Sequence, residues 1–156
     1  MNNSFTRRIS IIPVVINTVI FILLSSIHFY WAFGGKLWYD DVLPTSSNGL
    51  HKLTPSMAAS LMIALGLLFL ALITLGNQGL FDKYISRKYF RYGILIITML
   101  FLLRAIGDFR FIGFFKTVKR TRFGINDTQI FSPLCLFISV VSLLIFVTNR
   151  NKPSLY

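Results

Sequence analysis

Apolar residues fall into four long blocks along the chain, and polar or basic stretches separate the blocks. The blocks predict helices at about 9–33, 55–75, 92–113 and 133–148. Segments of this kind are typical of helices that cross a bilayer, because a span needs about 20 apolar residues. We therefore expect an all-α, four-helix transmembrane bundle in which residues 1–156 form a single integral membrane domain.

Residues at the block ends indicate where the helices begin. Thr54-Pro55 and Ser132-Pro133 each combine a capping residue with a proline, a pair that favours a helix start. Within the first block, Asn17 and His28 are eleven residues apart and therefore share one helix face. We expect that face to point into the bundle, since lipid offers no hydrogen-bond partner.

Small residues recur along the second block at Ser56, Ser60 and Ala64, in steps of four, and Ala71 lies near the same helix face. Small side chains at such spacing let two helix backbones approach closely in lipid. We therefore expect the second helix to pack tightly against a neighbour.

Composition supports membrane insertion and changes how the charge is interpreted. The chain is 54% hydrophobic and 13% charged, whereas soluble domains carry about 25% charged residues. A net charge of +11 would indicate nucleic acid in a soluble protein, but here the basic residues flank apolar blocks. The expected partners are the lipid bilayer and anionic lipid headgroups, with no nucleic acid. A homo-oligomer or a membrane partner protein stays open.

Four spans place both termini on one side of a cell membrane. The side of the membrane that holds the termini has eight Lys and Arg residues: Arg7, Arg8, Lys83, Arg87, Lys88, Arg91, Arg150 and Lys152. The opposite side has seven: Lys36, Lys52, Arg110, Lys116, Lys119, Arg120 and Arg122. The positive-inside rule needs an asymmetry that this count lacks. Arg7 and Arg8 precede the first helix and favour cytoplasmic termini.

Charged residues enter the third apolar block in the stretch Arg104-Ala105-Ile106-Gly107-Asp108-Phe109-Arg110. Charge at membrane depth is costly and persists only when it is paired, hydrated or functional. The helix would end near residue 109 or continue to residue 115, which sets the depth of Arg104. Asp108 is the nearest partner for Arg104, but Arg before Asp is the less favourable order within a helix. A partner on another helix is the alternative.

Connectivity brings the polar ends of three helices to one membrane face. The predicted ligand-binding site there has six residues: His28, Trp31, Arg104, Asp108, Arg110 and Asp127. We expect Asp108 to meet His28 or Trp31 across the bundle.

Each of these residues also has a structural interpretation. His28 would be a neutral hydrogen-bonding histidine, Arg104 and Asp108 an ion pair that fixes register, and Asp127 a turn or cap residue. Trp31 would belong to an interfacial aromatic belt. The basic run 116–122 would face lipid headgroups, and a specific anion pocket is the alternative.

Metal and cofactor chemistry finds little support. His28, Asp108 and Asp127 suit a metal by ligand type, but one intramembrane histidine disfavours such a site. His51 lies in a loop, which disfavours a bis-histidine haem. Cys135 is the only cysteine, so an intramolecular disulfide is excluded and a packing role is expected. We therefore expect no metal and no cofactor.

Three segments resemble a family of small bacterial membrane proteins that is catalogued only as a domain of unknown function, with four predicted helices. The segments are His28-Phe29-Tyr30-Trp31-Ala32-Phe33-Gly34-Gly35, Arg104-Ala105-Ile106-Gly107-Asp108-Phe109-Arg110, and Phe123-x-x-x-Asp127-Thr128 followed by Ser132-Pro133-Leu134-Cys135. The resemblance covers nearly the whole chain. It implies an integral membrane protein of the bacterial cell envelope and carries no substrate, cofactor or catalytic role.

These observations favour a non-enzymatic small membrane protein. Its polar cluster would bind a lipid headgroup or small ligand, or would organise the bundle. The alternative is a membrane-embedded enzyme acting on a lipophilic substrate, with His28 or Asp108 as acid/base and Arg104 as anion stabiliser. A transporter subunit is a third hypothesis, which would require an oligomer because four helices make a narrow bundle.

Overall fold

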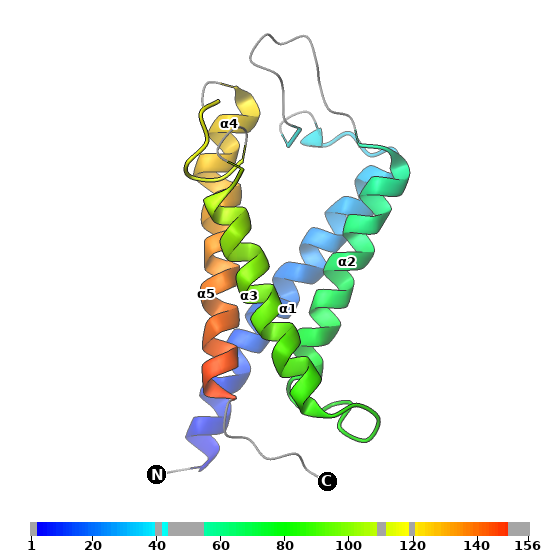
Figure 1. Cartoon of the computed structure of the whole chain (residues 1–156). Helices are drawn as coiled ribbons and strands as arrows, with labels where there is room; N and C mark the ends of the chain where they lie inside the picture. Colours follow the sequence, from blue (N-terminus) through cyan, green and yellow to red (C-terminus); the bar gives the residue numbers. More distant parts are fainter. Residues whose placement is uncertain (1–2, 40–41, 44–54, 109–111, 119–120, 150–156) are drawn as a thin grey trace.

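The protein is described from a computed structural model that covers residues 3–39, 42–43, 55–108, 112–118 and 121–149. These residues form helices and no strands. The elements are α1 (Asn3–Ala32), α2 (Met57–Gly76), α3 (Arg87–Ile106), α4 (Arg122–Asn126), the π-helical turn η2 (Asp127–Phe131) and α5 (Ser132–Thr148) (Figure 1). Because α4, η2 and α5 follow one another directly, they form one continuous rod.

Four segments of the described chain are long and apolar enough to cross a bilayer: Ile11–Ala32, Met57–Gly76, Arg87–Ile106 and Arg122–Thr148. Only 22–33% of each span is buried inside the protein. The remaining apolar surface faces outward, which suits lipid and would be unfavourable in water. The predicted all-α, four-helix architecture is confirmed, and the chain is a multi-pass membrane protein.

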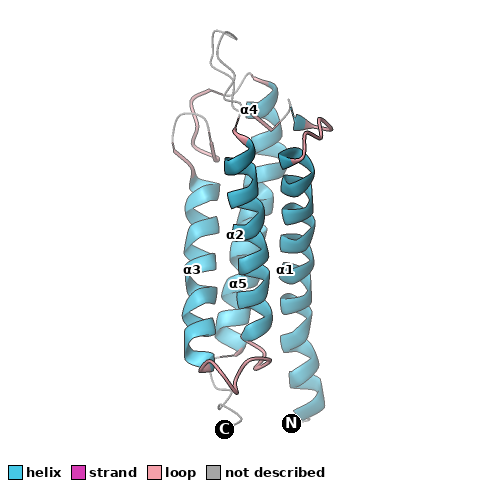
Figure 2. Cartoon of the chain, turned by 90° about the vertical axis from the view of Figure 1, so that its right-hand side faces the viewer, coloured by secondary structure: helices cyan, strands magenta, loops and turns pink. Residues whose placement is uncertain are grey.

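The helices form two pairs that separate toward one end of the molecule (Figure 1). α1 packs along α2, and α3 packs along α5. The beginning of α1 and the end of α5 lie at the opposite end, where the pairs approach each other (Figures 1 and 2). The segments that follow α1 and α3 therefore both lie at the end where the pairs separate, which we call the open end (Figure 1).

The core lies where the two pairs cross. Phe21 of α1 packs on Phe101 of α3, with ring centroids 5.6 Å apart, and Ile138 of α5 is fully buried beside them. Asn17 is also fully buried, and its Nδ2 donates to Ser142 Oγ on α5 at 2.8 Å. The prediction that Asn17 points into the bundle is confirmed, and a polar contact ties the two pairs together.

Close packing of α1 against α2 depends on small residues, as predicted. Ser60, Ala64 and Ala71 are all buried, but Ser56, the fourth predicted residue of this face, is exposed. Ser25 Oγ of α1 donates to the Ala64 carbonyl oxygen at 2.8 Å, so a side chain of α1 reaches the backbone of α2. Larger residues on this face would push the helices apart.

The start of α2 differs from the prediction. Ser56 is the cap, because its Oγ accepts from the Ala59 N–H at 3.2 Å. Pro55 therefore precedes the cap instead of occupying the first helical position, and Thr54 lies outside the described residues.

The predicted span 92–113 is wrong at both ends. α3 begins at Arg87, directly after Ser86, so the basic residues before Tyr92 belong to the helix. It ends at Ile106 because Gly107 has φ 94°, a left-handed conformation that stops an α-helix. Arg104 consequently lies in the last helical turn.

The predicted start of the fourth span at Ser132-Pro133 is also wrong. The rod begins at Arg122, where Thr121 Oγ1 accepts from the Gly124 N–H at 2.9 Å. Inside the rod, the Ser132 N–H donates to the Asp127 carbonyl, five residues back. This wider turn accommodates the ring of Pro133, which lacks an N–H and would clash in a regular α-helix.

Candidate functional site

Asp127 is a fully buried carboxylate at the start of η2. Its Oδ1 accepts from Arg104 Nη2 at 2.8 Å. Its Oδ2 accepts from Lys116 Nζ at 2.9 Å, from the Gly113 N–H at 2.7 Å and from Ser132 Oγ at 3.1 Å. Two cations and two neutral donors thus compensate for the loss of water around this charge. We call these residues the Asp127 network.

Lys116 is buried with Asp127 and is 2% exposed. Its Nζ also donates to the Gly113 carbonyl at 3.1 Å and to Thr128 Oγ1 at 2.6 Å. All three N–H bonds of the ammonium group therefore have acceptors. The expectation that the run 116–122 faces lipid headgroups is wrong for Lys116.

The segment after α3 reaches Asp127 because it folds back onto the helix end. The Phe114 N–H donates to the Ala105 carbonyl at 2.9 Å. Gly107 and Gly113, with φ of 94° and 90°, bring their backbones into contact. A Cβ on Gly107 would lie 1.7 Å from the Ile112 carbonyl oxygen, so only glycine fits there.

Asp108 lies in this turn. It is exposed, its Oδ1 accepts from the Ile112 N–H at 2.9 Å, and its own N–H donates to the Ile112 carbonyl at 3.2 Å. These hydrogen bonds join Asp108 to Ile112 of its own turn. The expected contact of Asp108 with His28 or Trp31 stays a prediction. Arg110 lies outside the described residues.

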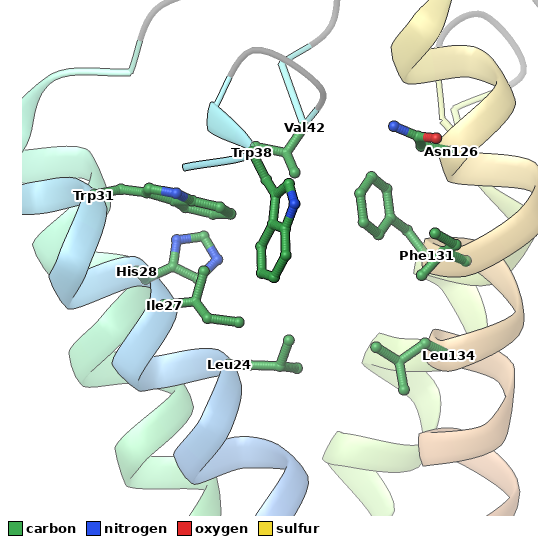
Figure 3. Close-up of a pocket in the computed structure, with 10 residues that line it drawn as sticks. Leu24, Ile27, His28, Trp31, Trp38, Val42, Asn126, Phe131 and Leu134 are labelled. Atoms are coloured by element: carbon green, nitrogen blue, oxygen red, sulfur yellow. The ribbon is translucent and has the colours of Figure 1, made fainter. Parts of the chain in front are cut away.

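A separate pocket of about 390 Å³ lies at the open end, between α1 and the α4–η2–α5 rod (Figure 3). Small-molecule sites typically enclose roughly 300–1,000 Å³. The pocket is lined by Leu24, Ile27, His28, Trp31, Trp38, Val42, Asn126, Ile130, Phe131 and Leu134. The walls are thus mainly aliphatic and aromatic. Their polar groups are the side chains of His28 and Asn126 and the indole N–H groups of Trp31 and Trp38.

Aromatic rings form the surface-facing part of this pocket. Trp31 Nε1 donates to the Leu37 carbonyl at 2.9 Å, and its ring meets His28 edge-on with centroids 5.0 Å apart. Tyr39 also contacts Trp31 edge-on. Trp38 has φ 57°, a left-handed backbone conformation that is costly for a bulky residue.

η2 connects the pocket and the Asp127 network. The carboxylate of Asp127 accepts hydrogen bonds from Arg104 and Lys116, whereas Ile130 and Phe131 of the same turn line the pocket. The buried ion pairs therefore hold one wall of the pocket in place.

Five of the six predicted site residues lie in the described part of the chain, and they fall into separate groups. His28 and Trp31 lie in the pocket, Arg104 and Asp127 form an ion pair, and Asp108 stabilises a turn. The alternative that Arg104 pairs with another helix is confirmed. Sequence reasoning missed Lys116, Trp38, Asn126 and Phe131. For Lys116, the available signal was the position of Asp127 shortly after the basic run 116–122, which offered the acid a basic partner.

Four membrane-spanning helices define the class of this chain, a small integral membrane protein of unknown activity. The family model described as "Protein of unknown function (DUF3995)" matches residues 21–142. The match includes the pocket and the Asp127 network, and the chain belongs to this family. No curated protein and no solved structure matches the chain.

Proposed function

We propose that this protein binds a lipophilic molecule in the pocket between its two helix pairs, without transforming it chemically. The observation that carries the proposal is an apolar pocket of about 390 Å³ with few polar groups at the open end of the bundle. Apolar walls supply affinity in such sites, and a few polar groups orient the ligand.

His28 is the polar group best suited to contact the ligand. It is half-buried and lines the pocket, and no described residue hydrogen-bonds to its imidazole. A polar group in an apolar pocket gains from a hydrogen-bonding partner. The preferred ligand would therefore combine an apolar body with one hydrogen-bonding group.

The lipid bilayer is the source of such molecules. The pocket residues lie toward the end of the bundle where the helix pairs separate (Figure 1). We propose that a lipophilic molecule enters there from the bilayer without crossing water. This arrangement supports the bilayer as a partner of the protein.

A basic, aromatic surface supports anionic headgroups as partners and cytoplasmic termini in a cell membrane. At the end of the bundle where α3 begins, Lys83 lies over Tyr84 and Lys88 over Tyr92. Aromatic residues anchor helices at either membrane interface, whereas Lys and Arg are enriched on the cytoplasmic side and attract anionic headgroups. On the opposite side, Lys116 is buried in an ion pair with Asp127 and therefore does not add to the positive charge of that surface.

The contacts of the charged residues do not favour the enzyme alternative. Arg104 bonds to Asp127, and Asp108 caps a turn. These contacts give Arg104 and Asp108 structural roles, which supports binding over catalysis by His28, Asp108 and Arg104.

Intrinsic fluorescence tests the proposed function. The chain has two tryptophans, Trp31 and Trp38, and both line the pocket. A brominated lysophosphatidylcholine, titrated into the purified protein in detergent, should quench this fluorescence to saturation. Leu134→Phe narrows the pocket and should weaken binding about tenfold, or about 1.4 kcal/mol.

Leu136→Phe is the matched control, because Leu136 is an exposed residue of the same helix outside the pocket. It should bind like the wild type. Non-saturable quenching, or the same loss of affinity in both variants, would refute the proposal.

A further inference from the structure

A second pocket lies next to the first along α1. It has a volume of about 290 Å³ and is lined by Leu23, Ser26, Ile27, Tyr30, Trp31, Leu37 and Trp38. Three of these residues, Ile27, Trp31 and Trp38, also line the first pocket. The same side chains thus form a partition between two apolar pockets.

The two pockets run parallel to each other. On α1 the first extends from Leu24 to Trp31 and the second from Leu23 to Trp31. At 1.5 Å per residue, each covers roughly 10–12 Å of the helix. Because α1 is a membrane span, both pockets follow the direction in which acyl chains run in a bilayer.

We infer that one diacyl lipid occupies both pockets, with one acyl chain on each side of the partition. This inference rests on the proposed function and names the class of ligand. The headgroup lies beyond the end of α1 at Ala32, on the side of the exposed residue Lys36. Two linked chains bind more tightly than one, because the second chain enters its pocket as an intramolecular step.

The partition argues against other occupants. A helix from a partner protein or a second copy of this chain is about 10 Å wide, and Trp31 and Trp38 divide the space that it would need. A ligand with a single apolar chain fills one pocket and leaves the other to a second molecule. A ligand with two apolar chains joined at one end can place one chain in each of the two pockets.

The experiment compares two brominated phosphatidylcholines that share headgroup and bromine position, one with two acyl chains and one with a single chain. Tryptophan quenching gives the affinities, and native mass spectrometry gives the stoichiometry. We expect the diacyl lipid to bind as one molecule per protein and at least about tenfold more tightly than the lysolipid.

Ser26→Phe fills the second pocket alone, because Ser26 lines only that pocket. Ser26 is exposed and its Oγ bonds to the Ile22 carbonyl of its own helix, so the bundle should fold normally. We expect this variant to lower the affinity for the diacyl lipid to that for the lysolipid. Ile22→Phe, an exposed site on the same helix outside both pockets, should leave the diacyl affinity unchanged.

Several results would overturn the inference. Equal affinities for the two lipids, with saturable lysolipid binding, would reject the two-chain ligand and leave the proposed function intact. Binding of neither lipid would reject both. A lipid-free dimer in native mass spectrometry, whose dissociation opens the pockets to lipid, would assign them to a second copy of the chain.

Discussion

Removing the Asp127 carboxylate tests whether the buried ion pairs hold the open end of the bundle together. In Asp127→Ala, Lys116 would remain buried at 2% exposure without its anionic partner. Arg104 is less affected because its side chain is 30% exposed and can extend toward the surface.

The expected loss of unfolding free energy follows from the burial of the Asp127 and Lys116 side chains. Removing one member of a buried ion pair costs about 3–5 kcal/mol, because the other charge stays desolvated. The hydrogen bonds from Gly113 and Ser132 are lost at the same time, and their contributions of about 1 kcal/mol each are not additive with the ion pair. We therefore expect Asp127→Ala to lower the free energy of unfolding by about 4 kcal/mol.

Equilibrium unfolding in mixed detergent and SDS micelles, followed by circular dichroism, measures this change. The double variant Asp127→Leu/Lys116→Met replaces both buried charges with apolar groups, and we expect it to recover more than half of the loss. A loss below about 1 kcal/mol for Asp127→Ala, the value for an exposed pair, would refute the reasoning. A double variant as unstable as the single one would refute it as well.

Three further predictions concern the fold and its orientation. Gly107→Ala should prevent the turn after α3, because the added Cβ would lie 1.7 Å from the Ile112 carbonyl oxygen, and the yield of folded protein should fall sharply. Gly66→Ala is the matched control, since nothing lies within 4 Å of its added Cβ. It should stabilise α2 by up to about 1 kcal/mol. Equal yields of the Gly107→Ala and Gly66→Ala proteins would contradict the account of the turn. Asn17→Leu removes the hydrogen bond to Ser142 and should cost about 0.6 kcal/mol and no more than about 1.7 in SDS unfolding. Reporter proteins fused to each terminus should both report the cytoplasm, and signals from the other side of the membrane at both termini would reverse the proposed orientation.

Much of the fold was predictable because a bilayer imposes strict requirements. Backbone groups in lipid must bond internally, so long apolar blocks become helices, and their number sets the topology. The burial of Asn17 and of Ser60, Ala64 and Ala71 followed from periodicity for the same reason. His28 and Trp31 are three residues apart on α1, so their common position in the pocket also follows from helix geometry.

The errors arose where tertiary contacts decide local structure. Ser132-Pro133 has the composition of a helix start, but Thr121 provides the cap and the π-turn at Asp127 accommodates the proline. Lys116 belongs to a basic run, and only the fold-back of its loop through Gly107 and Gly113 shows that it is buried. Trp38 enters the pocket through a left-handed backbone conformation that composition does not reveal.

Photocrosslinking in the membrane tests the central claim most directly. A lipid with a photoactivatable group on its acyl chain would be incorporated into vesicles with the intact protein, and mass spectrometry would identify the labelled residues. The account predicts labels concentrated on pocket residues from both helix pairs, such as Leu24 of α1 and Leu134 of α5. Labels confined to outward-facing residues such as Leu136 and Leu143 would contradict it.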